Sequence, residues 1–177
     1  MCNLYNITTT HEAMRRLFKK FSDLTNRVDP QMDIFPDYPA PVLRNIHGDD
    51  PELAMLRWGM PTPPMYMKGE ADPKTKRKPL HWFALNEEKP LFAFAGIWTS
   101  WKGVRKKKDV PVEVDIFGFL KTEPNTVVKS VHLKVMPVIL RTTEEIDTGL
   151  RAPTDKPRKC KAPTRRRSDG PHAKQRQ

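Results

Sequence analysis

The sequence has few of the features that mark disulfide-stabilised, zinc-binding or membrane-spanning proteins. Its two cysteines, Cys2 and Cys160, lie far apart and have no CxxC partner, so we expect neither a disulfide nor a zinc site. No apolar run approaches the roughly 18 residues of a transmembrane helix. No signal-peptide pattern is visible either, because asparagines and threonines interrupt the first apolar stretch. We therefore expect an intracellular protein with no membrane association, and a free reactive thiol remains open for Cys2.

Glycine-rich phosphate loops and clusters of metal-ligating residues are also missing from the sequence. The sequence therefore predicts no metal and no nucleotide cofactor. No pattern indicates an obligate protein partner.

Positive charge is what the sequence has in excess, and most of it lies near the C-terminus. Residues 151–177 carry 10 Lys/Arg and 2 Asp/Glu, a net charge of +8, whereas residues 1–150 carry 22 and 19, a net charge of +3. Apolar periodicity stops after Ala152. We therefore predict one domain over residues 1–151 and a disordered basic tail over 152–177. Such a tail favours binding to polyanions but defines no shaped site.

Hydrophobic periodicity predicts a mixed α+β domain. The pair Thr9 and Glu12 has capping-box spacing before an amphipathic helix that should reach about residue 24. A second such pair, Thr142 and Glu145, predicts a short helix ending near Leu150. Strands are expected at 2–7, 41–46, 52–58, 81–85, 91–98, 113–121 and 137–141. Irregular chain is expected at 33–41, a long loop at 68–79 and a basic hairpin tip at 102–108.

Cys2 is the residue with the most distinctive chemistry. Removal of Met1 would leave its α-amine and thiol on adjacent carbons, with ordinary pKa values of about 7.7–8.0 and about 8.5. An amine attacks an aldehyde to form a Schiff base, and the neighbouring thiol can then close a five-membered thiazolidine ring. A second interpretation is an N-terminal nucleophile amidohydrolase, in which the thiol attacks an amide. A cysteine at this position without any role is common.

Six short motifs, the first of which contains Cys2, occur in an order that resembles the SRAP (SOS response-associated peptidase-like) family across most of residues 1–150. The start reads Met1-Cys2-Asn3-Leu4-Tyr5. The others are the proline-rich loop at 35–41, the Trp-Gly strand end at 57–61, Ala95-Gly96-Ile97-Trp98, the corner at 117–125, and His132 followed by Met136-Pro137.

The resemblance implies a mixed, curved or barrel-like sheet with few flanking helices. It also implies a protein of the DNA damage response that binds single-stranded DNA at abasic sites, where the N-terminal cysteine forms a thiazolidine cross-link. Cys2 would supply the amine and thiol, and His132 would assist proton transfer around the sugar. Autoproteolytic removal of Met1 and lyase-like activity would accompany this. Contacts to DNA would come from Lys134, Pro41, Trp58, Met65 and Tyr66.

The sequence departs from the family pattern near residues 69–80 and after residue 150. An Asn-x-Arg segment and a strand ending in Glu are missing from the first region, which reads as an internal deletion. A basic proline-rich stretch replaces the final helix and strand of the family. The fold is therefore expected to be incomplete and the catalysis impaired. The alternative is a non-catalytic nucleic-acid-binding remnant, which retention of Met1 would favour.

Overall fold

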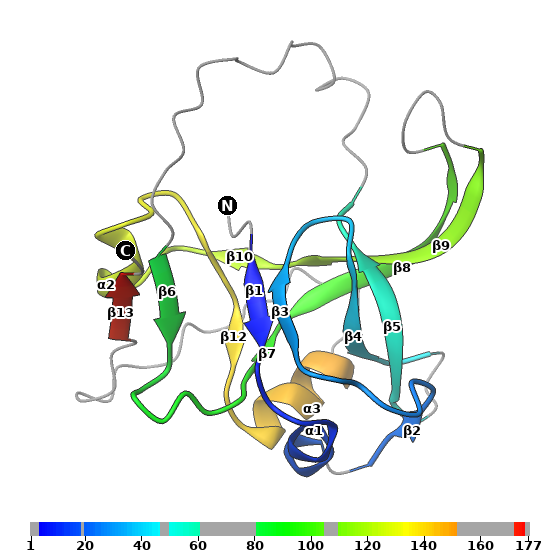
Figure 1. The fold of residues 1–177 in the computed structure, drawn as a ribbon, viewed down its shortest axis with the longest axis horizontal. Helices are drawn as coiled ribbons and strands as arrows, with labels where there is room; N and C mark the ends of the chain where they lie inside the picture. The colour runs from blue at the N-terminus through cyan, green and yellow to red at the C-terminus, as the bar shows by residue number, and fades with distance from the viewer. Residues whose placement is uncertain are drawn as a thin grey trace.

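We describe the fold from a computed structural model, which describes residues 4–18, 20–46, 50–60, 81–104, 110–151 and the backbone of 172–175. The architecture is α+β, with strands predominating and short helices α1 and α3 lying together at one end of the sheet (Figure 1). Over the residues just given, the main sheet is mixed and does not close into a barrel. The predicted fold class, a mixed α+β sheet with few helices, is therefore confirmed.

Five strands form the main sheet, in the order β2-β5-β9-β8, with β4 also paired to β5. Strand β4 pairs antiparallel with β5 along six residues, and β8 pairs antiparallel with β9 along eight. Both β2 and β9 run parallel to β5. The β8–β9 hairpin curves away from the rest of the sheet (Figure 1). The bounds are β2 (Ser22–Asp23), β4 (Pro39–Arg44), β5 (Glu52–Trp58), β8 (Gly96–Gly103) and β9 (Val112–Phe119).

Four two-stranded sheets connect segments that are distant in sequence. Their pairs are β1 (Tyr5–Ile7) with β3 (Gln31–Ile34), β6 (His81–Ala84) with β13 (His172–Gln175), β7 (Ala93–Phe94) with β12 (Ile139–Leu140), and β10 (Lys121–Thr122) with β11 (Met136–Pro137). Strand β3 and the start of β4 lie within residues 33–41, so the prediction that this stretch is wholly irregular was wrong.

Strand β13 lies inside the segment that we predicted to be a disordered tail. Its four residues, His172–Gln175, pair antiparallel with β6. Backbone hydrogen bonding along an open strand edge accounts for this pairing without any apolar periodicity in the sequence. Residues 152–171, which include most of the predicted tail, lie outside the described residues, as does the predicted loop at 68–79.

Two apolar clusters make up the core. The larger one lies on one face of the main sheet, and its buried members are Ile34, Ala40, Ala54, Leu56, Trp58 and Phe117. The smaller cluster joins Met14 of α1 to Val28 and Leu53 on the other face. Both depend on strand β5, whose alternate residues point to opposite faces of the sheet.

Helix α1 (His11–Leu17) is shorter than its apolar periodicity predicts. The residue that caps it is Thr10, whose hydroxyl accepts from the Ala13 N–H at 3.4 Å, so the predicted Thr9 cap was wrong. The chain becomes extended at Phe18, and the rings of Phe18 and Phe21 pack against the smaller core cluster. Tertiary packing therefore overrides the helical pattern.

Two further helices flank the strands. Helix α3 (Thr143–Arg151) begins with the predicted capping box, because the Thr142 hydroxyl accepts from the Glu145 N–H at 3.2 Å while the Glu145 carboxylate accepts from the Arg141 N–H at 2.7 Å. Helix α2 (Thr126–Lys129) was not predicted. Its cap is Asn125, whose side-chain oxygen accepts from the Val128 N–H at 2.9 Å.

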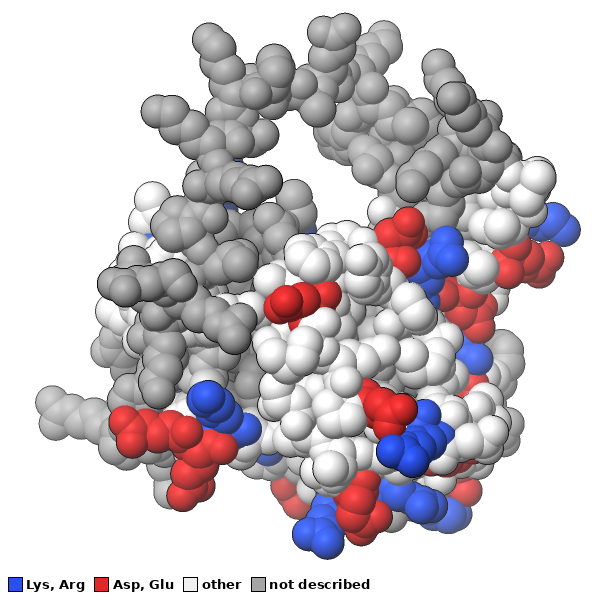
Figure 2. All heavy atoms as spheres, in the orientation of Figure 1, with Lys and Arg blue, Asp and Glu red and all other residues white. Residues whose placement is uncertain are grey.

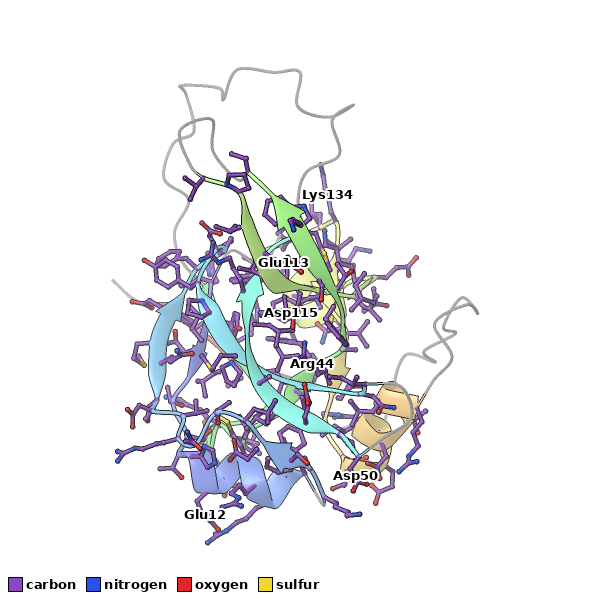
Figure 3. All side chains as sticks on the ribbon, turned by 90° about the vertical axis from the view of Figure 1, so that its right-hand side faces the viewer. Glu12, Arg44, Asp50, Glu113, Asp115 and Lys134 are labelled. Atoms are coloured by element: carbon purple, nitrogen blue, oxygen red, sulfur yellow. The ribbon has the colours of Figure 1, made fainter. Side chains whose placement is uncertain are left out.

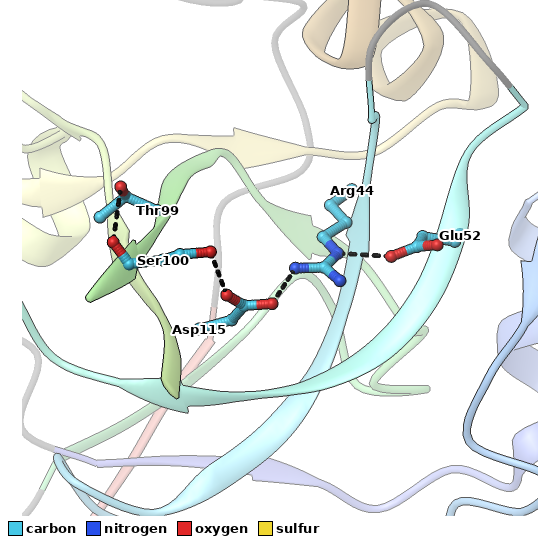
Figure 4. A network of polar contacts seen from close by, with 5 residues as sticks. All are labelled: Arg44, Glu52, Thr99, Ser100 and Asp115. Atoms are coloured by element: carbon cyan, nitrogen blue, oxygen red, sulfur yellow. Dashed lines mark hydrogen bonds and ion pairs between the residues drawn. The ribbon is translucent and has the colours of Figure 1, made fainter. Parts of the chain in front are cut away.

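A charged network ties four strands of the main sheet together (Figure 4). The Arg44 guanidinium donates to Glu52 at 2.6 Å and to Asp115 at 2.5 Å, and the Ser100 hydroxyl donates to Asp115 at 2.6 Å. The same guanidinium lies 4.2 Å from the centroid of the Trp98 ring. The Ser100 hydrogen bond, followed by that of Arg44, lowers the pKa of Asp115. The network therefore holds β4, β5, β8 and β9 at fixed relative positions.

Candidate functional site

A large cavity of about 1200 Å³ lies between the main sheet and the smaller sheets. It is lined mainly by apolar and aromatic side chains from segments far apart in sequence, among them Leu4, Tyr5, Pro41, Phe94, Phe119 and His132. A concave, apolar site with a few polar groups is the usual setting for a binding site. The start of β1 and the His132 segment therefore line the same cavity.

The start of β1 is fixed by aromatic packing. The Tyr5 ring makes edge contacts with Trp58, Phe94 and Phe119, with centroids 5.1, 6.1 and 5.5 Å away. The β1–β3 register places Tyr5 opposite Ile34. Such edge-to-face pairs contribute roughly 0.5–1.5 kcal/mol each beyond burial. The aromatic cluster therefore fixes the chain three residues beyond Cys2.

His132 follows helix α2 in a tight turn. Its backbone N–H donates to the Val128 carbonyl at 2.7 Å, and its side chain is half-buried with Nδ1 inaccessible to solvent. The turn is held from the other side as well, since the Asn125 N–H lies 3.3 Å from the Met136 sulfur. These contacts orient the imidazole toward the cavity that it lines.

The other predicted site residues have different surroundings. Pro41 lies on β4 opposite Met55 and lines the cavity. Trp58 is only 6% exposed and packs in the larger core cluster, where its ring supports Tyr5. Lys134 is exposed, and Figure 3 places it toward the end of the molecule at which β1 begins in Figure 1.

Cys2, Met65 and Tyr66 lie outside the described residues. Their roles, and those of Trp58, Pro41, Lys134 and His132, stay predictions. Among the parts of the chain that are described, no group of three or more His, Cys, Asp or Glu residues is arranged to hold a metal ion.

An exposed aromatic pair was missed by the sequence interpretation. Phe35 and Tyr38 are 45% and 53% exposed, and their rings are in edge contact at 5.8 Å. Backbone hydrogen bonds between Trp58 and the 37–38 segment hold this turn, with lengths of 2.7 and 2.9 Å. The pair lies in the proline-rich loop directly after Ile34, the residue opposite Tyr5. The sequence feature that could have revealed this pair is the presence of two aromatic residues within one short proline-rich loop.

Charge on the described surface is mixed. On the face shown in Figure 2, acidic and basic side chains alternate along the rim of a largely uncharged central area. In the sequence, residues 151–177 carry +8 of the net charge of +11. In the described ranges, no helix is long and apolar enough to cross a membrane.

Comparison with known proteins gives one family. The model of the SOS response associated peptidase (SRAP) family matches residues 68–172, more than half of the 177 residues. The match includes His132 and Lys134 but begins after Cys2, Pro41 and Trp58. No curated protein gives a significant match. The chain therefore belongs to the SRAP family, whose members are associated with the SOS response to DNA damage.

Proposed function

We propose that this protein binds single-stranded DNA and captures abasic sites covalently through Cys2. The observation that carries the proposal is the shared cavity, which Leu4 and Tyr5 line together with His132. A chain of three residues spans at most about 10–11 Å, so Cys2 stays within that distance of the anchored Tyr5. Tyr5 and His132 line the same cavity, and this supports a joint role for His132 and a Cys2 that is tethered to Tyr5.

The reaction needs no cofactor. The Cys2 amine attacks the C1 aldehyde of the open-chain sugar, a C–N bond forms, and one water leaves to give the Schiff base. The thiolate sulfur then adds to the imine carbon, and the nitrogen takes up a proton, which closes the thiazolidine. His132 is suited to carry protons in the first step because an imidazole can both accept and donate a proton.

The DNA strand would pass the end of the molecule at which β1 begins. Lys134 is exposed there and would pair with a phosphate as a point charge. The exposed rings of Phe35 and Tyr38 would stack on unpaired bases beside the lesion. Pro41 lines the cavity wall and would contact the lesion itself, as Met65 and Tyr66 would from the following segment.

We expect the cross-link to form slowly and lyase turnover to be weak, because residues 69–80 contain no Asn and their one Glu, Glu70, lies in a polar stretch that is a poor substitute for the family's Glu. The test is incubation with abasic and with intact single-stranded DNA, followed by denaturing electrophoresis. An adduct should form with abasic DNA alone. Cys2→Ala should abolish it, and His132→Gln should slow it without removing it.

Failure of the wild-type protein to give any adduct would refute the proposal. Intact-mass measurement gives an independent check on the N-terminus. Retention of Met1 would favour the non-catalytic remnant, because the α-amine of Cys2 would then be blocked. Turnover of glutamine would instead indicate the amidohydrolase.

A further inference from the structure

A chain of hydrogen bonds runs through helix α2 and ends at the backbone of His132. The Asn125 side-chain oxygen accepts from the Val128 N–H at 2.9 Å, and the carbonyl of that same Val128 accepts from the His132 N–H at 2.7 Å. The Val131 N–H donates to the same carbonyl at 3.0 Å. Both polar backbone groups of Val128 are therefore in use, one held by Asn125 and the other holding His132.

Asn125 is also attached to the strand that follows the turn. Its backbone N–H lies 3.3 Å from the Met136 sulfur, and its carbonyl accepts from the Lys129 N–H at 2.8 Å. Strand β11, which contains Met136, pairs with β10, the strand that precedes Asn125. The segment between the two strands is thus closed at its base, and Asn125 joins that base to α2.

The sequence of α2 gives this helix little stability of its own. Its four residues, Thr126–Lys129, make a single turn, and the first turn of a helix fixes several residues for few hydrogen bonds. Three of the four residues are β-branched, which lowers their side-chain freedom in a helix. Such a turn depends on its cap, and Asn is among the most favourable residues at the N-cap position.

The wall of the cavity beside His132 depends on this turn. Val128, Val131 and Met136 line the same cavity as His132. Without the cap, the Val128 N–H would lose its acceptor, and α2 would open from its first turn. The Val128 carbonyl would then no longer hold the His132 N–H, and the half-buried imidazole would lose its fixed position.

We infer that Asn125 is a positioning residue for His132 and that it acts through Val128. Its side chain holds the turn, and the turn places the imidazole that carries protons while the Schiff base forms. The inference rests on the role of His132 in the proposed function and adds the residue that keeps this histidine in place.

The rate of adduct formation with abasic single-stranded DNA measures the effect of the cap on the reaction. Asn125→Ala should slow the adduct by about fivefold, the factor to which loss of a typical N-cap corresponds. Asn125→Asp should restore most of the rate, because a carboxylate oxygen accepts the same hydrogen bond. Ser130→Ala is the matched control in the same turn. It removes the 2.7 Å hydrogen bond to the Val127 carbonyl, which is not part of the chain to His132, and should keep the wild-type rate.

A double variant separates positioning from a general loss of stability. In a His132→Gln background, Asn125→Ala should slow the adduct no further, because the group that Asn125 positions is gone. A purely structural effect would instead slow the reaction by the same factor in both backgrounds.

Amide hydrogen exchange in the free protein tests the contact independently of the DNA reaction. The His132 N–H should exchange faster in Asn125→Ala than in wild type or in Ser130→Ala. Because this measurement needs no DNA, an absent wild-type adduct would refute the proposed function and leave the positioning contact to be judged by exchange. Equal exchange at His132 in wild type and Asn125→Ala, an Asn125→Ala adduct rate equal to wild type, or equal slowing in both backgrounds would overturn the inference.

Discussion

Removal of the Arg44 guanidinium tests whether the charged network holds the main sheet. Arg44 and Glu52 are 10% and 17% exposed, so their ion pair is nearly buried, whereas Asp115 at 34% is partly solvated. Loss of one partner from a buried pair costs about 3–5 kcal/mol, because the remaining charge is left without compensation. Because Asp115 is partly solvated, we expect Arg44→Met to lower the free energy of unfolding by about 3 kcal/mol, the low end of that range. This figure includes the loss of the cation–π contact with Trp98.

The assay is equilibrium unfolding in urea, followed by tryptophan fluorescence. Lys102→Met is the matched control, since the Lys102–Glu113 pair is 77% and 69% exposed and pairs of that kind contribute about 0.2–1 kcal/mol. Adding Glu52→Gln to Arg44→Met should recover part of the loss, because it removes the stranded charge. If Arg44→Met lowers the free energy of unfolding no more than Lys102→Met does, the charged network does not hold the main sheet together.

Three further changes follow from single contacts. Gly96→Ala should lower the free energy of unfolding in urea by about 1–3 kcal/mol, because its Cβ would press on the Gly118 carbonyl; an unchanged midpoint would contradict the close approach. Thr142→Ala should cost about 1 kcal/mol in thermal unfolding by leaving the Glu145 N–H without its cap, whereas wild-type stability would show that α3 needs no cap. Because its pKa is lowered, the ionised Asp115 carboxylate stabilises the fold above pH 3.8, the ordinary pKa, and this contribution is lost as the pH falls through the pKa in the folded protein. Asp115→Asn should therefore have a lower free energy of unfolding than wild type at pH 7, and the difference should vanish in acid. A difference in stability that persists in acid would argue that ionisation of Asp115 is not its cause.

The sequence predicted best where local signals decide the structure. The capping box at Thr142 and Glu145 and the strand at 52–58 were both predicted, because caps and strand alternation depend on a few neighbouring residues. Helix α1 shows the limit of this approach. Its apolar spacing continues past Leu17, but Phe18 reaches the core as extended chain, an outcome that depends on packing.

Candidate site residues, which stay predictions, could be chosen from the sequence, but the geometry around them could not. Cys2 and His132 were found by their chemistry and by the family motifs, whereas the cavity that His132 shares with Tyr5 depends on pairings such as Tyr5 with Ile34 and Phe94 with Ile139. Such long-range pairing leaves no periodic signal in one sequence. The burial of Trp58 and the exposure of Phe35 follow from the same packing.

The central claim is that Cys2 acts through both its amine and its thiol. The most direct measurement is the intact mass of the adduct formed with abasic single-stranded DNA without reductant. A thiazolidine would give a hydrolysis-stable species equal in mass to the protein without Met1 plus the DNA, minus one water. Cys2→Ala keeps an amine but lacks the thiol, so it should give only a Schiff base that hydrolyses unless it is reduced. A stable adduct of equal yield from Cys2→Ala, or none from the wild type, would contradict the account.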